Sequence, residues 1–233
     1  MSIKEFFIDL FFPKFCFYCK KEGDYLCEDC LAFLEILEYT FCLCQKPQRL
    51  PDVKKCKRCQ RKKLNGLHFA LPYQNLFAKK LIHRFKYNPQ IKELAKTLIS
   101  IIITHFNLLE KPLKFGKDFI LASVPLTNKK KRERGFNQSE ELCKELNQFL
   151  EIPLIADCLL KTKDTPPQIE LQKKERLESQ KGVFLVKSSE DIKGKKILLV
   201  DDVYTTGATM EECARVLKIA GAKEVWGLVV ARG

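Results

Sequence analysis

The segment 196–209, KILLVDDVYTTGAT, limits what this chain can fold into more than any other stretch. Its apolar run, residues 197–200, predicts a short strand buried on both faces, as in the middle of a parallel sheet. Two carboxylates, Asp201 and Asp202, end this strand. Apolar side chains at helical spacing over residues 210–220 predict a helix soon afterwards. The segment therefore predicts an α/β fold in which a strand, a turn and a helix follow one another.

The turn between this strand and helix carries hydroxyl groups and a glycine: Thr205, Thr206, Gly207, Ala208 and Thr209. Hydroxyls, backbone N–H groups and a helix N-terminus would converge there on an anion. Gly207 lets the backbone close on that anion because it has no side chain. Aspartates at a strand end and threonines at a helix start are also ordinary turn and capping residues. The turn by itself therefore allows both a phosphate site and a purely structural role.

The whole run resembles the phosphoribosyl-pyrophosphate (PRPP) motif of type I phosphoribosyltransferases. An apolar strand, two acids, and then Thr-Thr-Gly-Ala-Thr make this a long match. The resemblance implies that Asp201 and Asp202 face the ribose hydroxyls, directly or through Mg²⁺. It implies that residues 205–209 cradle the 5′-phosphate.

Eight of the eleven cysteines form four close pairs in the first quarter of the chain: Cys16 with Cys19, Cys27 with Cys30, Cys42 with Cys44, and Cys56 with Cys59. Each pair can place two thiolates on one tight turn, and two turns complete a tetrahedral Zn²⁺ site. Four pairs therefore predict two structural sites with cysteine ligands alone. The short gap between the first two pairs favours sequential sites, 16/19/27/30 and 42/44/56/59, and an interleaved pairing is the alternative. The one-residue spacing of Cys42 and Cys44 is less usual for zinc.

The composition is that of a globular protein. Its 233 residues are 45% hydrophobic and include 17 Phe, enough to form the core of one large or two unequal domains. The three remaining cysteines are scattered, so we expect no disulfide framework and a reducing compartment. The first ten residues lack a basic segment with a small-residue cleavage site, and the apolar run near 98–103 is short. We therefore expect neither a secretory signal nor a transmembrane segment.

The formal net charge is +13, which suits phosphate-rich ligands or nucleic acid but also occurs on proteins without such a role. Much of this charge lies in a basic knuckle around the later cysteines, formed by Lys46, Arg49, Lys54, Lys55, Lys57, Arg58, Arg61, Lys62 and Lys63. Such residues are commonly solvated loop charges, and they are also the groups that bind nucleic-acid phosphates. Our nucleic-acid candidates in the knuckle are Lys54, Lys55, Lys57 and Arg58.

The rest of the chain alternates strand and helix patterns. Residues 67–73 and 119–124 predict strands, and helical spacing covers 76–86 and 91–109, with a break at Asn88-Pro89. A basic loop over 128–138 precedes a further helix that runs to Leu150, and such loops at strand ends collect anions in α/β sheets. At the chain start, Phe6, Phe7, Leu10, Phe11 and Phe12 predict a short helix over the metal module. We expect His68, His83 and His105 to be isolated from one another and from any acid cluster, with structural roles.

The block Arg134-Gly135-Phe136-Asn137-Gln138 resembles the signature of the ComF family. These competence-associated proteins join a Cys-rich zinc module to a phosphoribosyltransferase-like domain. The resemblance covers nearly the whole chain, including the cysteine pairs, Tyr73, Lys86-Tyr87, Val124-Pro125, residues 161–184 and the terminal residues 229–233. It implies a zinc-ribbon-like module over residues 1–66. It implies a type I phosphoribosyltransferase fold, a parallel sheet flanked by helices, over residues 67–233.

The same resemblance implies a PRPP site built from several segments. The loop that carries Pro125, Leu126, Lys131 and Arg134 would contact the pyrophosphate, opposite the acids and the 205–209 turn. Residues 161–168 resemble the family's mobile hood over PRPP, with Thr165, Gln168 and Arg176 at matching places. Ser179 departs from the pattern, because the family more often has Asn there.

Two classes of function follow from these resemblances. One is a PRPP- and Mg²⁺-binding ComF-type protein that handles incoming single-stranded DNA in the cytoplasm during natural transformation. For that role Lys129, Lys130 and Arg132 join the knuckle as DNA-binding candidates, and the resemblance leaves open a competence helicase as partner and a place at the inner face of the membrane. The alternative is an active phosphoribosyltransferase with an unidentified acceptor, in which pyrophosphate departs from the ribose C1.

Overall fold

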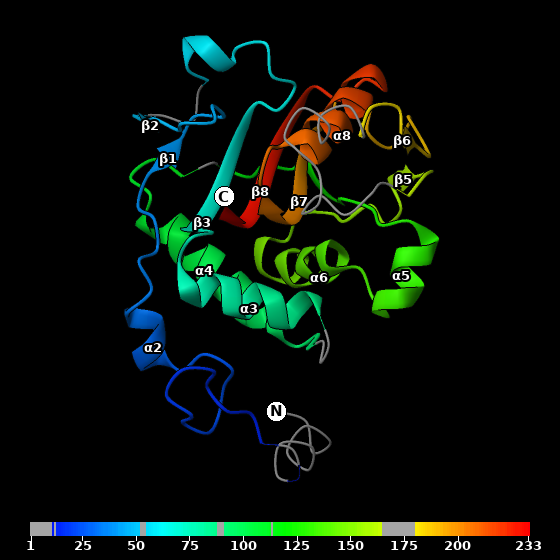
Figure 1. Ribbon diagram of the computed structural model, residues 1–233. Helices are drawn as coiled ribbons and strands as arrows, with labels where there is room; N and C mark the ends of the chain where they lie inside the picture. The colour runs from blue at the N-terminus through cyan, green and yellow to red at the C-terminus, as the bar shows by residue number, and fades with distance from the viewer. Residues whose placement is uncertain (1–10, 12, 52–54, 88–90, 113, 165–179) are drawn as a thin grey trace.

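The computed structural model describes residues 11, 13–51, 55–87, 91–112, 114–164 and 180–233 (Figure 1). The aromatic start of the chain, apart from Phe11, lies outside these ranges. Lys54 and the predicted hood residues Thr165, Gln168, Arg176 and Ser179 also lie outside the described residues.

A four-stranded parallel sheet forms the centre of the fold, in the order β3-β8-β7-β4. Its strands are β3 (Gly66–Pro72), β4 (Phe119–Ser123), β7 (Lys196–Tyr204) and β8 (Glu224–Arg232). The prediction of a central buried strand is confirmed, since β7 lies between β8 and β4 and its residues 197–200 are fully buried. The prediction that the two acids end this strand is wrong. Pairing with β8 continues to Tyr204, opposite Arg232, and keeps the backbone extended.

Helices cover both faces of the sheet, as Figure 1 shows. On one face lie α3 (Leu76–Lys86), α4 (Leu94–Leu108) and α6 (Gln138–Leu150), and on the other lies α8 (Ala208–Ile219) with the antiparallel pair β5 (Leu159–Lys161) and β6 (Phe184–Val186). Alternate residues of β7 serve the two faces: Leu198 and Val200 pack in the first core, and Ile197 and Leu199 in the second. This arrangement confirms the predicted parallel sheet flanked by helices.

The basic segment after β4 is a helix and not the predicted loop. It forms α5 (Asn128–Arg134), whose first turn is capped by the Thr127 hydroxyl, which accepts from the Lys130 N–H at 3.3 Å. Gly135 ends the helix at φ 72°, a left-handed conformation that favours glycine. Thr127 and Gly135 are thus start and stop signals that outweigh the charge repulsion within the segment.

The cysteine-rich region contains short elements: α2 (Glu28–Ala32), β1 (Thr40–Phe41), β2 (Arg49–Leu50) and η1 (Lys57–Cys59). Its two halves pack on different faces of the sheet. Cys16 and Cys30 share a core with α3 and α4, while Cys42 and Cys59 share the other core with α8. The boundary between residues 66 and 67 stays a prediction. No helix among the described residues has both the length and the apolar character needed to cross a bilayer.

Two of the histidines lie together in the core and are not isolated as predicted. The rings of His68 and His105 are 6.2 Å apart, and both side chains are about 1% exposed. The contact arises because α4 packs over β3, which brings together residues far apart in the sequence. Burial, together with the charge of His105, lowers the pKa of His68 to about 3. Neither ring nitrogen of His68 has a hydrogen-bond partner among the described residues.

We expect His68 to make the protein less stable in acid. Its pKa is lower in the folded chain than in the unfolded one, so its contribution is fully present above pH 6.5 and is lost as the pH falls towards 3. Between pH 7 and pH 5 this loss amounts to about 2 kcal/mol. In urea unfolding, the free energy of unfolding that His68→Leu loses between pH 7 and pH 5 should be smaller than the parent's loss by that amount. The exposed His83→Leu should match the parent. Equal pH loss in His68→Leu and the parent would contradict the assignment.

Candidate functional site

The two acids of β7, a half-buried Asp201 and a buried Asp202, are held by hydrogen bonds and an ion pair. Asp202 makes an ion pair with Lys86 at the end of α3, with 2.7 Å between Nζ and Oδ1. Asp201 Oδ1 accepts hydrogen bonds from the Ser139 hydroxyl and the Asp202 N–H, both at 2.9 Å. The first turn of α6 and the last turn of α3 therefore hold the two carboxylates at the end of the sheet.

The two carboxyl groups of the pair lie in different electrostatic environments. Burial and the charge of Asp202 raise the pKa of Asp201 to about 7. Burial lowers the pKa of Lys86, but the two carboxylates outweigh burial and the net shift is upward. Lys86 thus balances one carboxylate, and a divalent cation would favour ionisation of the other. Carboxylate oxygens are the donors that Mg²⁺ takes from proteins, usually together with waters and substrate phosphates, so the pair fits Mg²⁺.

The phosphate turn, residues 205–209, follows the acids directly. Gly207 has φ +79°, and a Cβ there would overlap the Tyr204 phenol, so both conformation and space require glycine. The helix α8 begins at Ala208, two residues before the predicted start. The first N–H groups of a helix have no acceptor within it, which makes this turn suited to an anion. Thr206 caps the turn, since its hydroxyl accepts from the Ala208 N–H at 3.3 Å.

A cavity of about 680 Å³ joins the acids and the turn. Its walls come from the carboxyl ends of β3, β4 and β7 and from the ends of neighbouring helices. The lining residues include Tyr73, Lys86, Tyr87, Val124, Pro125, Leu126, Lys130, Glu133, Arg134, residues 137–139, Lys161, residues 201–205 and residues 207–210. This is the edge at which open parallel sheets bind ligands, and the volume suits a ligand of the size of PRPP.

The basic side chains of α5 divide between the cavity and the surface. Lys130 and Arg134 line the cavity, and the Arg134 guanidinium lies 5.7 Å from the centre of the Tyr87 ring. Lys131 is exposed and pairs with Glu140 at 2.8 Å, outside the lining. Lys129 and Arg132, the other predicted DNA contacts, are also exposed and lie outside the lining. Lys130, predicted as a DNA contact, therefore occupies the place that the sequence suggests for Lys131.

The eight paired cysteines form two clusters that follow the sequential pairing. The thiol sulfurs of the first Cys cluster, Cys16, Cys19, Cys27 and Cys30, all lie within 4.8 Å of one another. In the second Cys cluster the sulfurs of Cys42, Cys44 and Cys56 do so, and Cys59 Sγ lies 3.4 Å from Cys56 Sγ. Ligands of a tetrahedral Zn²⁺ with bonds of about 2.3 Å are roughly 3.8 Å apart. Both clusters could therefore hold a metal ion, and their all-thiol donors fit structural zinc.

Comparison with known proteins places the chain in a family. Residues 134–233 match the family model described as Phosphoribosyl transferase domain. Competence protein F of Haemophilus influenzae is 31% identical over 154 residues, which are 65% of this chain and 67% of that protein. This chain belongs to the ComF family.

Other relatives of this ComF-family chain extend the match. Competence protein ComFC of Streptococcus pneumoniae is 28% identical over 208 residues, 88% of this chain and 87% of that protein. A match of that length necessarily includes part of the cysteine-rich region. DNA utilization protein YhgH of Escherichia coli K12 is 30% identical over 150 residues, 64% of this chain and 65% of that protein.

Several lining residues of this ComF-family protein were not predicted as site residues. Lys86 and Tyr87 belong to a segment of the ComF resemblance, but nothing in the sequence assigns Lys86 to Asp202. Ser139 directly follows the block 134–138, and its hydrogen bond to Asp201 joins the first turn of α6 to the acid pair. Lys161 lines the cavity at the end of β5, and burial together with the charge of Lys130 lowers its pKa. The predicted Thr206 lies outside the lining.

Proposed function

We propose that this ComF-family protein binds PRPP together with Mg²⁺ in the 680 Å³ cavity. One observation carries the proposal: the acid pair and the phosphate turn share one wall of a cavity whose other walls carry Lys130, Arg134 and Lys161. The phosphate turn would hold the 5′-phosphate. Asp201 and Asp202 would hold the ribose hydroxyls and the metal, and the basic side chains with Pro125 and Leu126 would receive the pyrophosphate.

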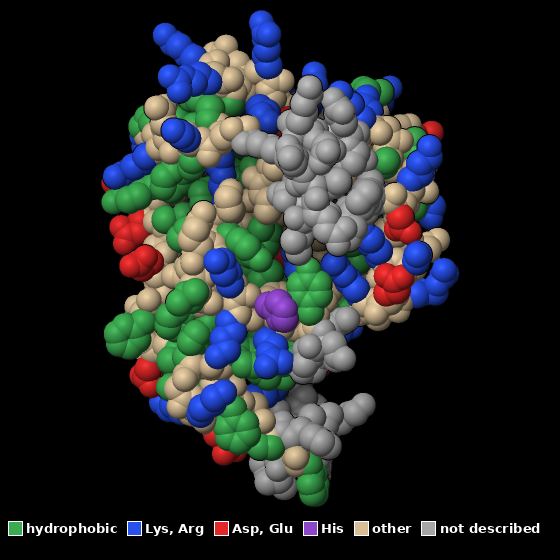
Figure 2. Space-filling model, in the orientation of Figure 1, with side chains coloured by type: hydrophobic (Ala, Val, Ile, Leu, Met, Phe, Trp, Pro, Cys, Tyr) green, Lys and Arg blue, Asp and Glu red, His purple; other side chains and the backbone are tan. Residues whose placement is uncertain are grey.

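We propose in addition a role in natural transformation, in the cytoplasm, on single-stranded DNA. The names of the relatives, competence protein and DNA utilization protein, support this role. Lysine and arginine side chains gather at the upper end of the molecule in Figure 2, where Figure 1 places the segment around η1. In the knuckle, Lys57, Arg58 and Arg61 are exposed. Lys55 is partly buried and donates to the Lys62 carbonyl, so we assign it to the structure of the knuckle.

The second candidate is an active phosphoribosyltransferase, which the family match over residues 134–233 favours. In that reaction the bond between ribose C1 and pyrophosphate breaks, pyrophosphate leaves with the bonding electrons, and an acceptor nucleophile bonds to C1. Bound Mg²⁺ would neutralise charge on the leaving group. Lys130 and Arg134 would stabilise that group further.

One titration separates the two candidates. PRPP is added with and without single-stranded DNA, and both binding and pyrophosphate release are measured. PRPP binding that changes when DNA is added, without release of pyrophosphate, supports a DNA-handling protein in which PRPP is a regulatory ligand. Release that depends on an added acceptor supports the transferase. Absence of PRPP binding contradicts both.

We expect the knuckle to contribute a salt-dependent part of DNA binding. Neutralised phosphates release counterions, at about 0.7 units of the log–log salt slope per contact on a single strand. Substituting Lys57, Arg58 and Arg61 by Gln should lower the slope by roughly 2 and weaken binding at low salt. Fluorescence anisotropy over a range of salt concentrations measures both effects.

The matched control removes the same charge elsewhere. Lys111, Lys114 and Lys117 are exposed and precede β4, at the edge of the sheet away from the cavity. Their replacement by Gln should leave the slope near the parent's. If the two triple variants show the same salt slope, the basic side chains of the knuckle are solvated surface charges and do not form a DNA-binding site.

A further inference from the structure

A buried arginine joins the second Cys cluster to the end of β7. Arg232, 6% exposed, is the last residue of β8. Its guanidinium donates to the carbonyl oxygen of Cys42 at 2.7 Å and to that of Cys44. No carboxylate of the described residues forms an ion pair with Arg232. The nearby groups that can carry negative charge are Tyr204 and cluster thiols, among them Cys42 and Cys44.

Arg232 also contacts the residue that precedes the phosphate turn. It lies opposite Tyr204 in the sheet register, and its guanidinium lies 5.3 Å from the centre of the Tyr204 ring. The Gly233 N–H donates to the Tyr204 carbonyl at 2.9 Å. The buried phenol of Tyr204 fills the space where a side chain at Gly207 would lie. The position of the Tyr204 ring therefore limits where the phosphate turn can go.

A second connection reaches the other end of the turn. Glu211, in the first turn of α8, accepts a hydrogen bond from the Lys63 N–H at 2.8 Å. The Glu211 N–H in turn donates to the Gly207 carbonyl at 2.9 Å. Lys63 follows Cys59 closely in the chain. The second Cys cluster is thus linked to the residues on both sides of the phosphate turn, to Tyr204 through Arg232 and to Glu211 through the Lys63 backbone.

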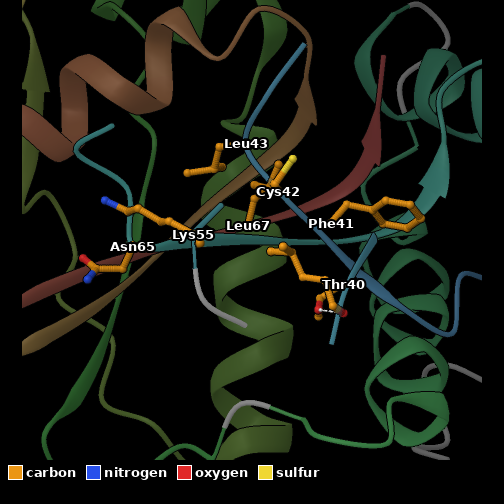
Figure 3. A pocket seen from close by; sticks show the side chains of 9 residues that line it. Thr40, Phe41, Cys42, Leu43, Lys55, Asn65 and Leu67 are labelled. Atoms are coloured by element: carbon orange, nitrogen blue, oxygen red, sulfur yellow. Dashed lines mark hydrogen bonds between the residues drawn. The ribbon is translucent and has the colours of Figure 1, made fainter. Parts of the chain in front are cut away.

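The second Cys cluster and the sheet are packed tightly enough to transmit a displacement from one to the other. Figure 3 shows Cys42, Lys55 and Leu67 around the small space between the cysteine-rich segment and β3. That space is about 10 Å³, close to the least that a single water needs. A shift of the cluster would therefore move its neighbours and would not be absorbed by empty volume.

We propose that Arg232 and Glu211 are positioning residues that couple metal binding at the second Cys cluster to the phosphate turn. Four thiolates around Zn²⁺ carry excess negative charge, which balances the buried Arg232 guanidinium. A metal-loaded cluster holds the Cys42 and Cys44 carbonyls and the Lys63 backbone in place. Loss of the metal releases both ends of the turn. The effect on ligand binding rests on the proposed phosphate site. The coupling between the second Cys cluster and residues 205–211 does not.

Hydrogen exchange tests the coupling without any ligand. Glu211→Leu removes the acceptor of the Lys63 N–H, and Cys44→Ser weakens the cluster. In both, amide exchange over residues 205–211 should rise about tenfold, as expected when a hydrogen bond to a charged group is lost. Glu211→Gln keeps an acceptor oxygen and should restore protection. Cys158→Ser, a cysteine outside both clusters, should match the parent.

Ligand binding distinguishes positioning from general destabilisation. Arg232→Lys keeps the charge but cannot bridge both carbonyls, and it should weaken ribose 5-phosphate binding about tenfold. Pyrophosphate binding, assigned to the side of the cavity with Lys130 and Arg134, should stay near the parent value. Equal loss for both ligands would overturn the positioning role.

The two proposals fail in different ways. Parental exchange over residues 205–211 in Cys44→Ser, with zinc content lowered, overturns the coupling. If the parent binds neither ribose 5-phosphate nor pyrophosphate, the proposed function is wrong, and the exchange data still decide the coupling.

Discussion

Chelation of the bound metal should unfold the cysteine-rich region, and metal analysis of the intact protein should find about two zinc ions per chain. Formation of such a site and folding of its ligands are one equilibrium, worth about 10–16 kcal/mol in zinc-finger peptides. Cys16, Cys42 and Cys59 are at most 2% exposed, so their region cannot keep its packing once the thiols lose the metal. Because the two clusters share the two cores, loss of the module should also lower the stability of the sheet domain. Circular dichroism and limited proteolysis before and after chelation measure this loss.

Single substitutions assign the two ions to the two clusters. Cys56→Ser should retain one zinc ion per chain, and Cys158→Ser should retain both. One ion in the parent would mean that the second Cys cluster does not form a site. Absence of zinc from the parent would contradict both predicted metal sites.

Asp201→Asn combined with Asp202→Asn should abolish Mg²⁺-dependent PRPP binding. The amides keep the size of the side chains and lose the charge that suits a metal and hydroxyl groups. Loss of two charge-assisted contacts, at about 1.5–3 kcal/mol each, predicts a fall in affinity of about a hundredfold or more. Isothermal calorimetry with PRPP and Mg²⁺ measures it.

Lys86 complicates the double variant and also supplies its control. Asp202→Asn leaves the Lys86 cation without its partner, which destabilises the fold. Adding Lys86→Met removes that stranded charge, so a folded triple variant that still fails to bind PRPP separates loss of the site from loss of the fold. Glu133→Gln removes an exposed acid from the same cavity and should bind like the parent. Undiminished affinity in the folded triple variant would contradict the assignment of the acids.

Local signals in the sequence predicted most of the elements that build the site. The apolar run 197–200 identified a strand of the central sheet because helices cover both faces of the sheet and bury both sides of the strand. The cysteine spacing indicated the sequential clusters, since short gaps limit which thiols can meet. The exact ends of elements were less predictable. Strand pairing extended β7 past the acids, and the left-handed Gly207 moved the start of α8.

The missed features depend on contacts between distant parts of the chain. Lys86 meets Asp202 only because α3 ends at the carboxyl edge of the sheet beside β7. The contact of His68 with His105 requires the packing of α4 over β3. Lys130 and Lys131 are neighbours in a basic run, and only the helical conformation of α5 decides which one lines the cavity. Local pattern carries no information on such choices.

PRPP binding at the acid pair is tested by a calorimetric titration of the parent protein with PRPP, first with Mg²⁺ and then with Mg²⁺ omitted and no chelator added, so that the zinc ions stay bound. We expect one PRPP bound per chain in Mg²⁺ and a large loss of affinity when Mg²⁺ is omitted, because the acid pair then lacks the cation that joins it to the ligand. Absence of binding in Mg²⁺, with both zinc ions retained and the fold intact, would contradict it.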